Sequence, residues 1–382
     1  MRILFLDTSV TYGGGQEALL SLVDGMRSKD HRVLVLATGR GRLAVRLTEA
    51  GVEWKPWGLR SKERMARGYG GSEFLGIPLG IRDLLRVMDQ WGPDLLHANS
   101  ERAALVCALL PRARRKPFVF HDRTLEERRG LIPWIGRRSD AVIAISSAVS
   151  VKHRRKGRGS HVRIVPDGID LGRFSPLPPR SAPGPKVFAV VGRLSHEKGH
   201  RIFVNAALEF LEAGGEAEFV LCGNWTTGGG SDFERRILAR FENRPAAKRI
   251  RVLGFQEDVA EFLEKTDVMV VPSLREGFGI AAVEALARGR PVIASRVGGL
   301  PEIVQHGRNG LLFEAGNVSQ LAAAMRSIVD DPELYGRLAA LAPSSVRRFS
   351  AEETIRSIHE AYRAVLLPST GPSERRVPET PC

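Results

Sequence analysis

The sequence predicts an α/β protein with two Rossmann-like, parallel-sheet domains that face each other across a central cleft. The length of 382 residues favours two domains. In each half of the chain, apolar runs of strand length alternate with helical stretches, which is typical of parallel sheets. A proline-rich stretch, SPLPPRSAPGP at residues 175–185, interrupts the alternation near the middle. We expect it to link the two domains.

The first predicted domain covers residues 1–172. Its strand-like runs occur at 2–7, 31–37, 94–98, 118–122, 140–146 and 162–168. A stretch rich in helix formers, 16–28, follows the first of these runs. A strand followed by a helix and another strand gives parallel pairing, so we expect one parallel sheet.

After a linker at 173–185, the second predicted domain covers residues 186–349. Its strand-like runs occur at 186–192, 217–223, 249–255, 267–273, 290–295 and 310–315. Ser350 and Glu353 then stand in capping-box spacing at the start of a predicted helix, 350–367, which we expect to pack back toward the first domain. Residues 368–382 have a composition typical of disorder.

The motif EGFGIAAVE places two carboxylates, Glu276 and Glu284, eight positions apart. The run 267–273 before it predicts a strand, and the residues after it predict a helix that ends at Gly289. Glu276 then lies in the loop at the carboxyl end of a strand, and Glu284 lies more than one turn inside the helix. Backbone amides near 277–280 would bind an anion, and the carboxylates would accept hydrogen bonds from hydroxyls. The motif therefore predicts a nucleotide-sugar site.

Two other interpretations of this motif stay open. Glu284 would by default be a solvated or capping charge. Residues 277–282 also fit the dinucleotide pattern G-x-G-x-x-A, although no acidic residue ends the next strand-like run, 290–295.

A second polar cluster, VGRLSHEKG, contains Arg193 and Lys198. It follows the first strand-like run of the second half, so both side chains would lie at the carboxyl edge of the sheet, where open sheets bind ligands. Two cations there can hold a diphosphate and stabilise it as it leaves. A solvated loop is the alternative interpretation, since Arg and Lys are mostly surface residues.

The motifs of this chain occur in an order found in a known enzyme family. Together they resemble glycosyltransferase family 4, the glycosyl transferases of group 1: VPDGID (165–170), VGRLSHEKG (191–199), EGFGIAAVE (276–284), VGGLPEIV (297–304) and NGLLF (309–313). The resemblance covers nearly the whole chain. It implies the GT-B fold, with an acceptor-binding first domain and a donor-binding second domain. It also implies a retaining hexosyltransferase that uses a UDP- or GDP-sugar and a glycan or lipid-linked acceptor in cell-envelope polysaccharide synthesis.

The resemblance implies roles for individual residues. Arg193 and Lys198 would hold the diphosphate. Glu276 would contact the donor sugar hydroxyls, and Glu284 would contact the ribose. His121 stands at the position of the family's active-site histidine, and together with Glu276, Arg193 and Lys198 it makes up the expected catalytic set.

The glycine loop TYGGGQ (11–16) matches the loop whose amides approach donor and acceptor in this family. The remaining expected donor-binding residues come from this loop and from the EGFGIAAVE motif: Gly14, Gly15, Gly277, Phe278 and Gly279. Gln16 and His97 are acceptor-side candidates. Other interpretations stay open, because a histidine at a strand end can simply hydrogen-bond neighbouring backbone, and three glycines can form a plain turn before a helix.

The sequence offers no obvious metal site. No D-x-D motif and no C-x-x-C pair occurs. We therefore expect neither metal nor cofactor, with cations and helix amides stabilising the diphosphate instead. In retaining enzymes of this family, the attacking hydroxyl approaches on the leaving group's own face and the departing phosphate takes the proton.

The net charge of +14 belongs mainly to the first half. Residues 1–172 hold 30 Lys and Arg and 18 Asp and Glu, net +12, whereas residues 173–382 hold 27 and 25, net +2. The surplus gathers in runs at 60–67, 112–116 and 152–158, with tryptophans such as Trp57 nearby in the sequence. We expect an anionic membrane surface or a phosphorylated, lipid-linked acceptor as partner. A solvated basic face is the alternative.

Three widely spaced cysteines, Cys107, Cys222 and Cys382, favour a reducing compartment. The N-terminus does not resemble a signal peptide, and the apolar run 103–110 is too short to cross a bilayer. We expect a cytoplasmic protein, with peripheral contact at the inner face of the membrane as an extension. Two other function classes stay open, a nucleotide-sugar epimerase of the same fold and a non-enzymatic polyanion-binding protein. No nucleic-acid-binding signature is present.

Overall fold

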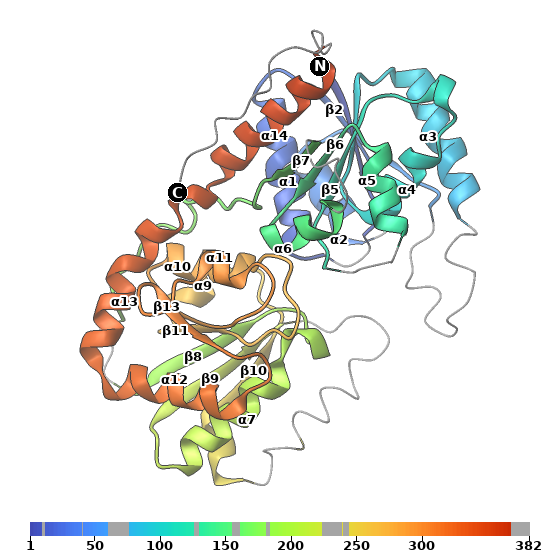
Figure 1. Cartoon of the computed structure of the whole chain (residues 1–382). Helices are drawn as coiled ribbons and strands as arrows, with labels where there is room; N and C mark the ends of the chain where they lie inside the picture. Colours follow the sequence, from blue (N-terminus) through green and yellow to red (C-terminus); the bar gives the residue numbers. More distant parts are fainter. Residues whose placement is uncertain are drawn as a thin grey trace, which may run out of the picture.

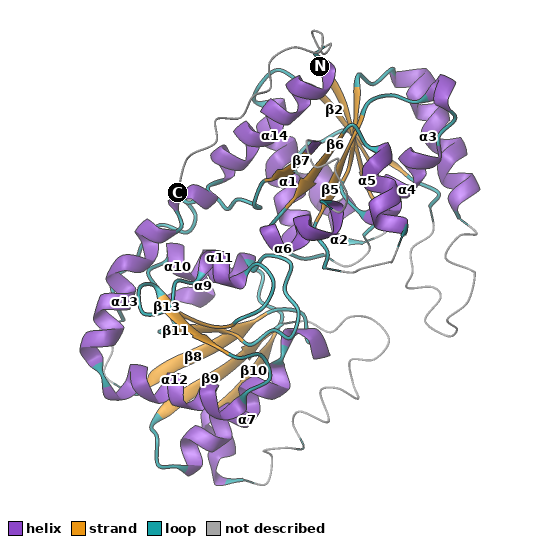
Figure 2. Ribbon diagram, viewed as in Figure 1, coloured by secondary structure: helices purple, strands orange, loops and turns teal. Residues whose placement is uncertain are grey.

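The computed structural model describes nine stretches of the chain: residues 1–9, 12–39, 41–59, 76–125, 130–154, 161–180, 184–223, 239 and 244–367. Two helix-covered sheets form two lobes, one at each end of the molecule (Figures 1 and 2). The predicted disordered tail 368–382, the basic run 60–67 and most of the basic run 152–158 lie outside the described residues.

The first lobe contains a seven-stranded sheet in the order β3-β2-β1-β4-β5-β6-β7. Its strands are β1 (Arg2–Asp7), β2 (Arg32–Ala37), β3 (Trp54–Pro56), β4 (Leu95–Ala98), β5 (Phe118–Asp122), β6 (Ala141–Ala144) and β7 (Val162–Ile164). Its helices are α1 (Gly14–Arg27), α2 (Arg42–Glu49), α3 (Ile77–Trp91), α4 (Glu101–Leu109), α5 (Leu131–Arg138) and α6 (Ser147–Ser150). All of the strand pairs are parallel. The sequence does not predict the edge strand β3, because three residues ending in proline carry no alternation.

The second lobe contains a six-stranded parallel sheet in the order β10-β9-β8-β11-β12-β13. Its strands are β8 (Lys186–Val191), β9 (Ala217–Cys222), β10 (Ile250–Gly254), β11 (Val268–Val271), β12 (Val292–Ser295) and β13 (Gly310–Phe313). Its helices are α7 (His200–Glu212), α9 (Val259–Glu264), α10 (Ile280–Ala287), α11 (Leu300–Ile303), α12 (Val318–Asp330) and α13 (Pro332–Ser345). The predicted α/β fold with two Rossmann-like sheets is confirmed.

Apolar strands explain why both sheets are covered by helices. The central strands are buried along their whole length, as parallel strands with helices on both faces should be. In the second lobe Phe188 stacks on Phe219, with ring centroids 5.6 Å apart. Cys107 and Cys222 are buried and unpaired. Within the described residues, no helix combines the length and the apolar character that crossing a membrane requires.

The chain passes between the lobes twice, and the two passages touch. Ile169 N–H donates to the Phe349 carbonyl at 3.0 Å, and Ala351 N–H donates to the Ile169 carbonyl at 2.8 Å. Helix α14 (Ala351–Leu366) then lies against α1 of the first lobe (Figure 1). Gly25 permits this close approach, because a Cβ there would lie 2.2 Å from Ile355 Cδ1.

The start of α14 keeps half of the predicted capping box. Ser350 Oγ accepts a hydrogen bond from Glu353 N–H at 3.2 Å and caps the helix. The Glu353 carboxylate, however, pairs with Arg356 one turn later.

Candidate active site

The two polar motifs of the second lobe meet in one ion pair. Lys198, in the turn between β8 and α7, donates from Nζ to Glu276 Oε2 at 2.7 Å. Ser273, at the end of β11, donates to the same oxygen at 2.9 Å. Both charged side chains retain contact with solvent, being 27% and 11% exposed. The structure therefore brings together a cation and a carboxylate that the sequence places in separate motifs.

Arg193 lies on the same loop as Lys198 and is exposed. No residue in the described part of the chain pairs with its guanidinium. It is a cation at the carboxyl edge of the sheet with its hydrogen-bonding capacity unused.

The loop between Glu276 and α10 depends on glycine at two positions. Gly279 has φ +114°, a conformation that favours glycine, and it begins α10. A Cβ on Gly277 would lie 2.7 Å from the Arg123 carbonyl of the first lobe, which leaves no room for one. Ser146 of the first lobe also donates to the Gly277 carbonyl at 2.7 Å. The loop is thus one of the places where the two lobes touch.

Phe278 is placed differently from the other loop residues. Its side chain is 3% exposed, and its ring lies edge-on to Phe349, with centroids 5.3 Å apart. The ring belongs to the core, so a donor contact from Phe278 could come only from its backbone.

Glu284 projects from the second turn of α10 and is partly buried. Burial raises the pKa of its carboxyl to about 8, Arg173 opposes that shift, and Glu17 of the first lobe adds to it. A solvated surface carboxylate would not show this shift. Its partial burial distinguishes Glu284 from a fully solvated carboxylate, and its contact with the ribose stays a prediction.

The glycine loop of the first lobe approaches the start of α10. A Cβ on Gly14 would lie 2.7 Å from Ile280 Cγ2, and a Cβ on Gly15 would lie 3.3 Å from Arg123 Cδ. Gly14 thus lies close to the second lobe, whereas Gly15 lies close to Arg123 of its own lobe. Gln16 follows in the first turn of α1 and is partly exposed.

The two predicted histidines contact each other at the ends of neighbouring strands. His121 Nδ1 lies 3.3 Å from His97 Nε2, and His97 Nδ1 lies 2.7 Å from the Tyr362 hydroxyl of α14. Within the described residues the hydrogen bonds of both rings go to side chains and none goes to backbone. His97 has no exposed surface and lies behind His121. The prediction that it contacts the acceptor directly is therefore not supported.

A buried ion pair lies beside His121. The Arg123 guanidinium donates to Asp167 from Nε at 2.9 Å and from Nη2 at 3.0 Å. It also bonds the Asn99 side chain, which in turn donates to Asp7 at 2.5 Å. Burial lowers the pKa of His97 and His121 well below the usual histidine range, and the Arg123 charge lowers both further. Both rings are neutral at pH 7.

Several residues of this region were missed in the sequence. Asp167 stands in the VPDGID motif but received no role, and Arg123 and Ser273 each follow a predicted strand. Position at a strand end was a usable signal for these three residues. Tyr362 had no such signal, because it lies on a terminal helix 265 residues from His97.

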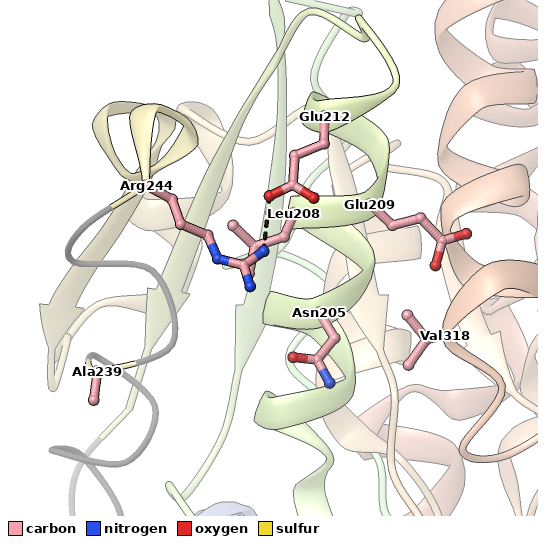
Figure 3. A pocket seen from close by; sticks show the side chains of 7 residues that line it. All are labelled: Asn205, Leu208, Glu209, Glu212, Ala239, Arg244 and Val318. Atoms are coloured by element: carbon pink, nitrogen blue, oxygen red, sulfur yellow. Dashed lines mark hydrogen bonds and ion pairs between the residues drawn. The ribbon is translucent and has the colours of Figure 1, made fainter.

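A hollow on the second lobe lies away from these residues. It runs along α7 and is lined by Asn205, Leu208, Glu209, Glu212, Ala239, Arg244 and Val318. Figure 3 shows Arg244 pointing toward Glu212, with which it forms an ion pair of 2.7 Å. None of the predicted site residues lines it. Among the residues that the structure describes, no group of three His, Cys, Asp or Glu side chains could hold a metal ion.

Two family profiles match the chain, one for each lobe. The profile described as Glycosyltransferase Family 4 matches residues 12–173. The profile described as Glycosyl transferases group 1 matches residues 178–344.

Curated relatives include several D-inositol 3-phosphate glycosyltransferases. That of Corynebacterium jeikeium is 33% identical over 232 residues, which are 57% of this chain and 54% of the relative. That of Actinosynnema mirum is 31% identical over 291 residues, which are 72% of this chain and 67% of the relative. The matches therefore span little more than half to two thirds of the length of these relatives.

Solved structures share the fold. The Anabaena protein HepE in complex with UDP and glucose superposes with a TM-score of 0.79 at 24% identity, over 95% of this chain and all of that one. Sucrose-phosphate synthase from Thermosynechococcus elongatus superposes with a TM-score of 0.80 at 21% identity, over 95% of this chain and 98% of that one. At these identities the likeness concerns the fold.

Proposed function

The chain belongs to glycosyltransferase family 4 and has the GT-B fold, and from this premise we propose that it transfers a sugar from a nucleotide-diphosphate sugar to a hydroxyl group. The observation that carries the proposal is the Lys198–Glu276 ion pair at the contact between the lobes. A diphosphate would attract Lys198 and Arg193. Glu276 would then be free to accept hydrogen bonds from the sugar hydroxyls.

Transfer with retention of configuration fits the same residues. The bond between the anomeric carbon and the phosphate oxygen breaks, the acceptor oxygen bonds to that carbon on the same face, and the departing phosphate takes the acceptor proton. Asp167, the carboxylate nearest His121, is held by Arg123 and is a poor candidate for a general base. We therefore expect the departing phosphate, and not Asp167, to take the proton of the acceptor hydroxyl.

The donor is the first unknown to test. We expect UDP- or GDP-sugars to raise the melting temperature of the wild-type protein and to stabilise Lys198→Ala much less, because binding to the folded state raises apparent stability. The anomeric configuration of the product, measured by NMR, tests retention. An inverted product would contradict the mechanism, and stabilisation by no nucleotide sugar would contradict the function.

The acceptor has two candidate classes. The sequence predicts a glycan or lipid-linked hydroxyl in cell-envelope synthesis, and the names of the relatives add a phosphorylated polyol, inositol 3-phosphate. Mass analysis of reactions with each acceptor and a matching donor separates them. Conversion of the donor sugar without any acceptor would indicate an epimerase instead.

Catalysis without a metal is part of the proposal. Lys198, Arg193 and the amides at the start of α10 would supply the positive charge that a divalent ion provides elsewhere. We expect turnover to persist in EDTA. Loss of turnover in EDTA with recovery in magnesium or manganese would contradict it.

A membrane contact through the basic first lobe remains a proposal, and the structure narrows where it could lie. The run 112–116 precedes β5, so it lies at the edge of the sheet opposite the histidines. Within it Arg114 pairs with Asp89, and Arg115 pairs with Asp140 at 3.4 Å. This run cannot meet an acceptor at the candidate site, but its outward face is available to an anionic surface.

Two other sequence features of the basic lobe point inward. Lys152 is 8% exposed and pairs with Asp122 at 2.9 Å. Trp57 is 4% exposed, and its indole N–H donates to the Gly80 carbonyl at 3.0 Å. These side chains stabilise the first lobe and do not contribute to a surface for lipid.

A further inference from the structure

Three buried aromatic side chains form a line from the C-terminal helix to the candidate site. Tyr362 comes from α14, His97 from the end of β4 and His121 from the end of β5. Their relative exposures are 0%, 0% and 1%. The Tyr362 hydroxyl lies 2.7 Å from His97 Nδ1, and His97 Nε2 lies 3.3 Å from His121 Nδ1.

The Tyr362 hydroxyl determines which atom donates and which accepts in each of these two hydrogen bonds. Its hydrogen has one acceptor in the described part of the chain, His97 Nδ1, so the hydroxyl donates to that nitrogen. His97 must then carry its proton on Nε2 and donate it to His121 Nδ1. His121, in turn, must carry its proton on Nε2.

The reverse direction is less favourable. If His121 donated from Nδ1 and His97 donated to the Tyr362 oxygen, the hydroxyl hydrogen would be buried without an acceptor. His121 Nε2 would also lose its proton and remain without a donor. Two buried polar groups would be unsatisfied, whereas the first direction leaves one, and each such group is costly.

Both imidazoles are neutral, which this argument requires. Burial and the Arg123 guanidinium hold the pKa of both rings well below the usual range. The ring planes are also held in place, since His97 lies at 84° to His121 and at 77° to Tyr362. Phe5 packs against His97, with centroids 4.9 Å apart.

The free end of the line faces the contact between the lobes. No described residue forms a hydrogen bond with His121 Nε2, and the nearest Asp167 oxygen lies 3.8 Å away. Arg123, two residues later, lies against both Gly15 and Gly277. Among the described residues, the Nε2–H group is therefore buried without an acceptor, two residues before an arginine that lies at the contact between the lobes.

We propose that Tyr362 and His97 are positioning residues that lock His121 in the Nε2–H tautomer, so that His121 offers a fixed neutral N–H donor to an oxygen atom of the bound substrate. The identity of that substrate rests on the proposed function. The tautomer lock does not. Through it, the C-terminal helix determines the chemistry of a residue in the first lobe.

The test is nitrogen NMR of the full chain with ¹⁵N-labelled histidine, without any ligand. The chain has 9 histidines, and His121→Gln assigns the key ring by loss of its signals. In the wild type we expect His97 and His121 each to show a protonated Nε2 and an unprotonated Nδ1. In Tyr362→Phe, which removes only the hydroxyl, both directions of the line become comparable and both rings should show mixed tautomers.

Tyr335→Phe is the matched control. Tyr335 lies in the second lobe and is 4% exposed. Its hydroxyl donates to Asp267 of the same lobe at 3.4 Å. Its loss should leave both histidine tautomers unchanged. Unchanged tautomers in Tyr362→Phe, or a wild-type His121 protonated on Nδ1, would overturn the lock, and the wild-type result decides even if Tyr362→Phe fails to fold.

Activity provides a second measurement once a donor is known. In Tyr362→Phe we expect kcat to fall about tenfold, as loss of one well-aligned hydrogen bond should produce. The affinity for the nucleoside diphosphate should be unchanged, because its predicted contacts lie in the second lobe. A fall in kcat without a change of tautomer would show a merely structural role and overturn the proposal. Absence of any transferase activity in the wild type would contradict the proposed function and leave the NMR result standing.

Discussion

The two lobes bring different kinds of polar group to the contact between them. The second lobe contributes two cations that reach solvent, the exposed Arg193 and Lys198, whose side chain is 27% exposed although its partner Glu276 is only 11% exposed. The first lobe contributes buried groups, neutral histidines and an Arg123–Asp167 pair whose side chains are 12% and 7% exposed. The cations of the second lobe can reach a ligand from solvent, whereas the polar groups of the first lobe form a buried hydrogen-bond network.

This difference implies different responses to a ligand. Lys198 already contacts solvent, and a bound diphosphate would replace its carboxylate partner, so we expect Lys198 to leave Glu276 more readily than Arg123 leaves Asp167. Leaving a buried polar group unsatisfied costs about 1–3 kcal/mol, so the first lobe should keep its arrangement. Substrate binding should therefore rearrange the second lobe's side chains and leave the first lobe's in place.

The largest expected effect comes from removing either of the two cations of the second lobe, Lys198 or Arg193. Each alanine substitution should raise the activation free energy by ~3 kcal/mol and so lower kcat/KM roughly a hundredfold, because each cation is expected to stabilise the developing charge on the leaving diphosphate. Steady-state kinetics and thermal melting would separate activity from folding. Lys265→Ala is the control, since Lys265 forms an exposed ion pair with Glu261 at 3.2 Å far from the site. Near-normal rates in both site variants would rule out their contact with the diphosphate.

The two carboxylates should differ in what they bind. Glu276→Gln should weaken binding of the nucleotide sugar by ~1–3 kcal/mol, because Glu276 is predicted to contact the sugar. Binding of the bare nucleoside diphosphate should weaken much less. Glu284→Gln should weaken both ligands, since it is predicted to contact the ribose. Calorimetry with the two ligands measures both effects. Equal losses for Glu276→Gln would exclude a sugar contact.

Glu284 should also make stability depend on pH. Its pKa is raised from the ordinary 4.5 to about 8, so the folded state holds this proton more tightly than the unfolded state. The free energy of unfolding should therefore be unaffected below pH 4.5 and fall between pH 4.5 and 8 relative to Glu284→Gln, by on the order of 2 kcal/mol after allowing for partial solvent contact. Denaturation at pH 5 and pH 8 tests this. Parallel pH curves for both proteins would refute the raised pKa.

A smaller effect is expected from a bridge between the lobes. Arg42 of α2 lies over the Tyr12 and Phe255 rings and pairs with Glu257 at 2.8 Å. Arg42→Ala should weaken donor binding by about 1 kcal/mol, which raises the donor KM about fivefold and leaves kcat nearly unchanged. An exposed cation–π contact is worth little more than this energy. Arg326→Ala, which removes a similar contact with Phe210 inside the second lobe, is the control. An unchanged KM would mean that this bridge does not help to hold the lobes together over the donor.

The smallest effect of a single substitution concerns the basic run 112–116. Each basic residue near an anionic surface is worth about 1 kcal/mol, so replacing Arg112, Arg114, Arg115 and Lys116 together should reduce binding to anionic liposomes while one substitution does little. Nucleotide-sugar binding should be unchanged, because the run lies at the other edge of the sheet. Binding that is absent at low salt, or equal on neutral liposomes, would contradict a membrane role.

The fold was largely predictable because buried parallel strands are continuous apolar runs. Every run marked in the sequence contains a strand of the structure, and the missing strand, β3, is a short edge strand at Trp54–Pro56. The motif around Glu276 was equally readable, since a strand, a tight loop and a helix follow one another locally. The contact between the two motifs could not be predicted, because the Lys198–Glu276 pair joins loops that are 78 residues apart in the sequence.

The first lobe shows the limit more clearly. His97 and His121 each lie near the carboxyl end of a strand, but the register pairs His97 with Val119, two residues before His121. The sequence alone does not reveal this register. His97 also contacts Tyr362, which reaches it only because α14 returns to the first lobe. Burial and tautomer are products of long-range packing, and local pattern carries no record of them.

The two passages between the lobes are hydrogen-bonded to each other at Ile169 and at Phe349–Ala351. Together they form the hinge, here called the axle. Any motion of one lobe against the other must turn about it, so displacement grows with distance from that point. Ser147, which bonds Glu302 across the lobes, follows β6 beside the axle, whereas Arg42 follows β2 toward the far edge of the same sheet. A small rotation that barely stretches the first contact would pull Arg42 away from Glu257, so we expect any opening of the lobes to be widest at the sheet edge farthest from these passages.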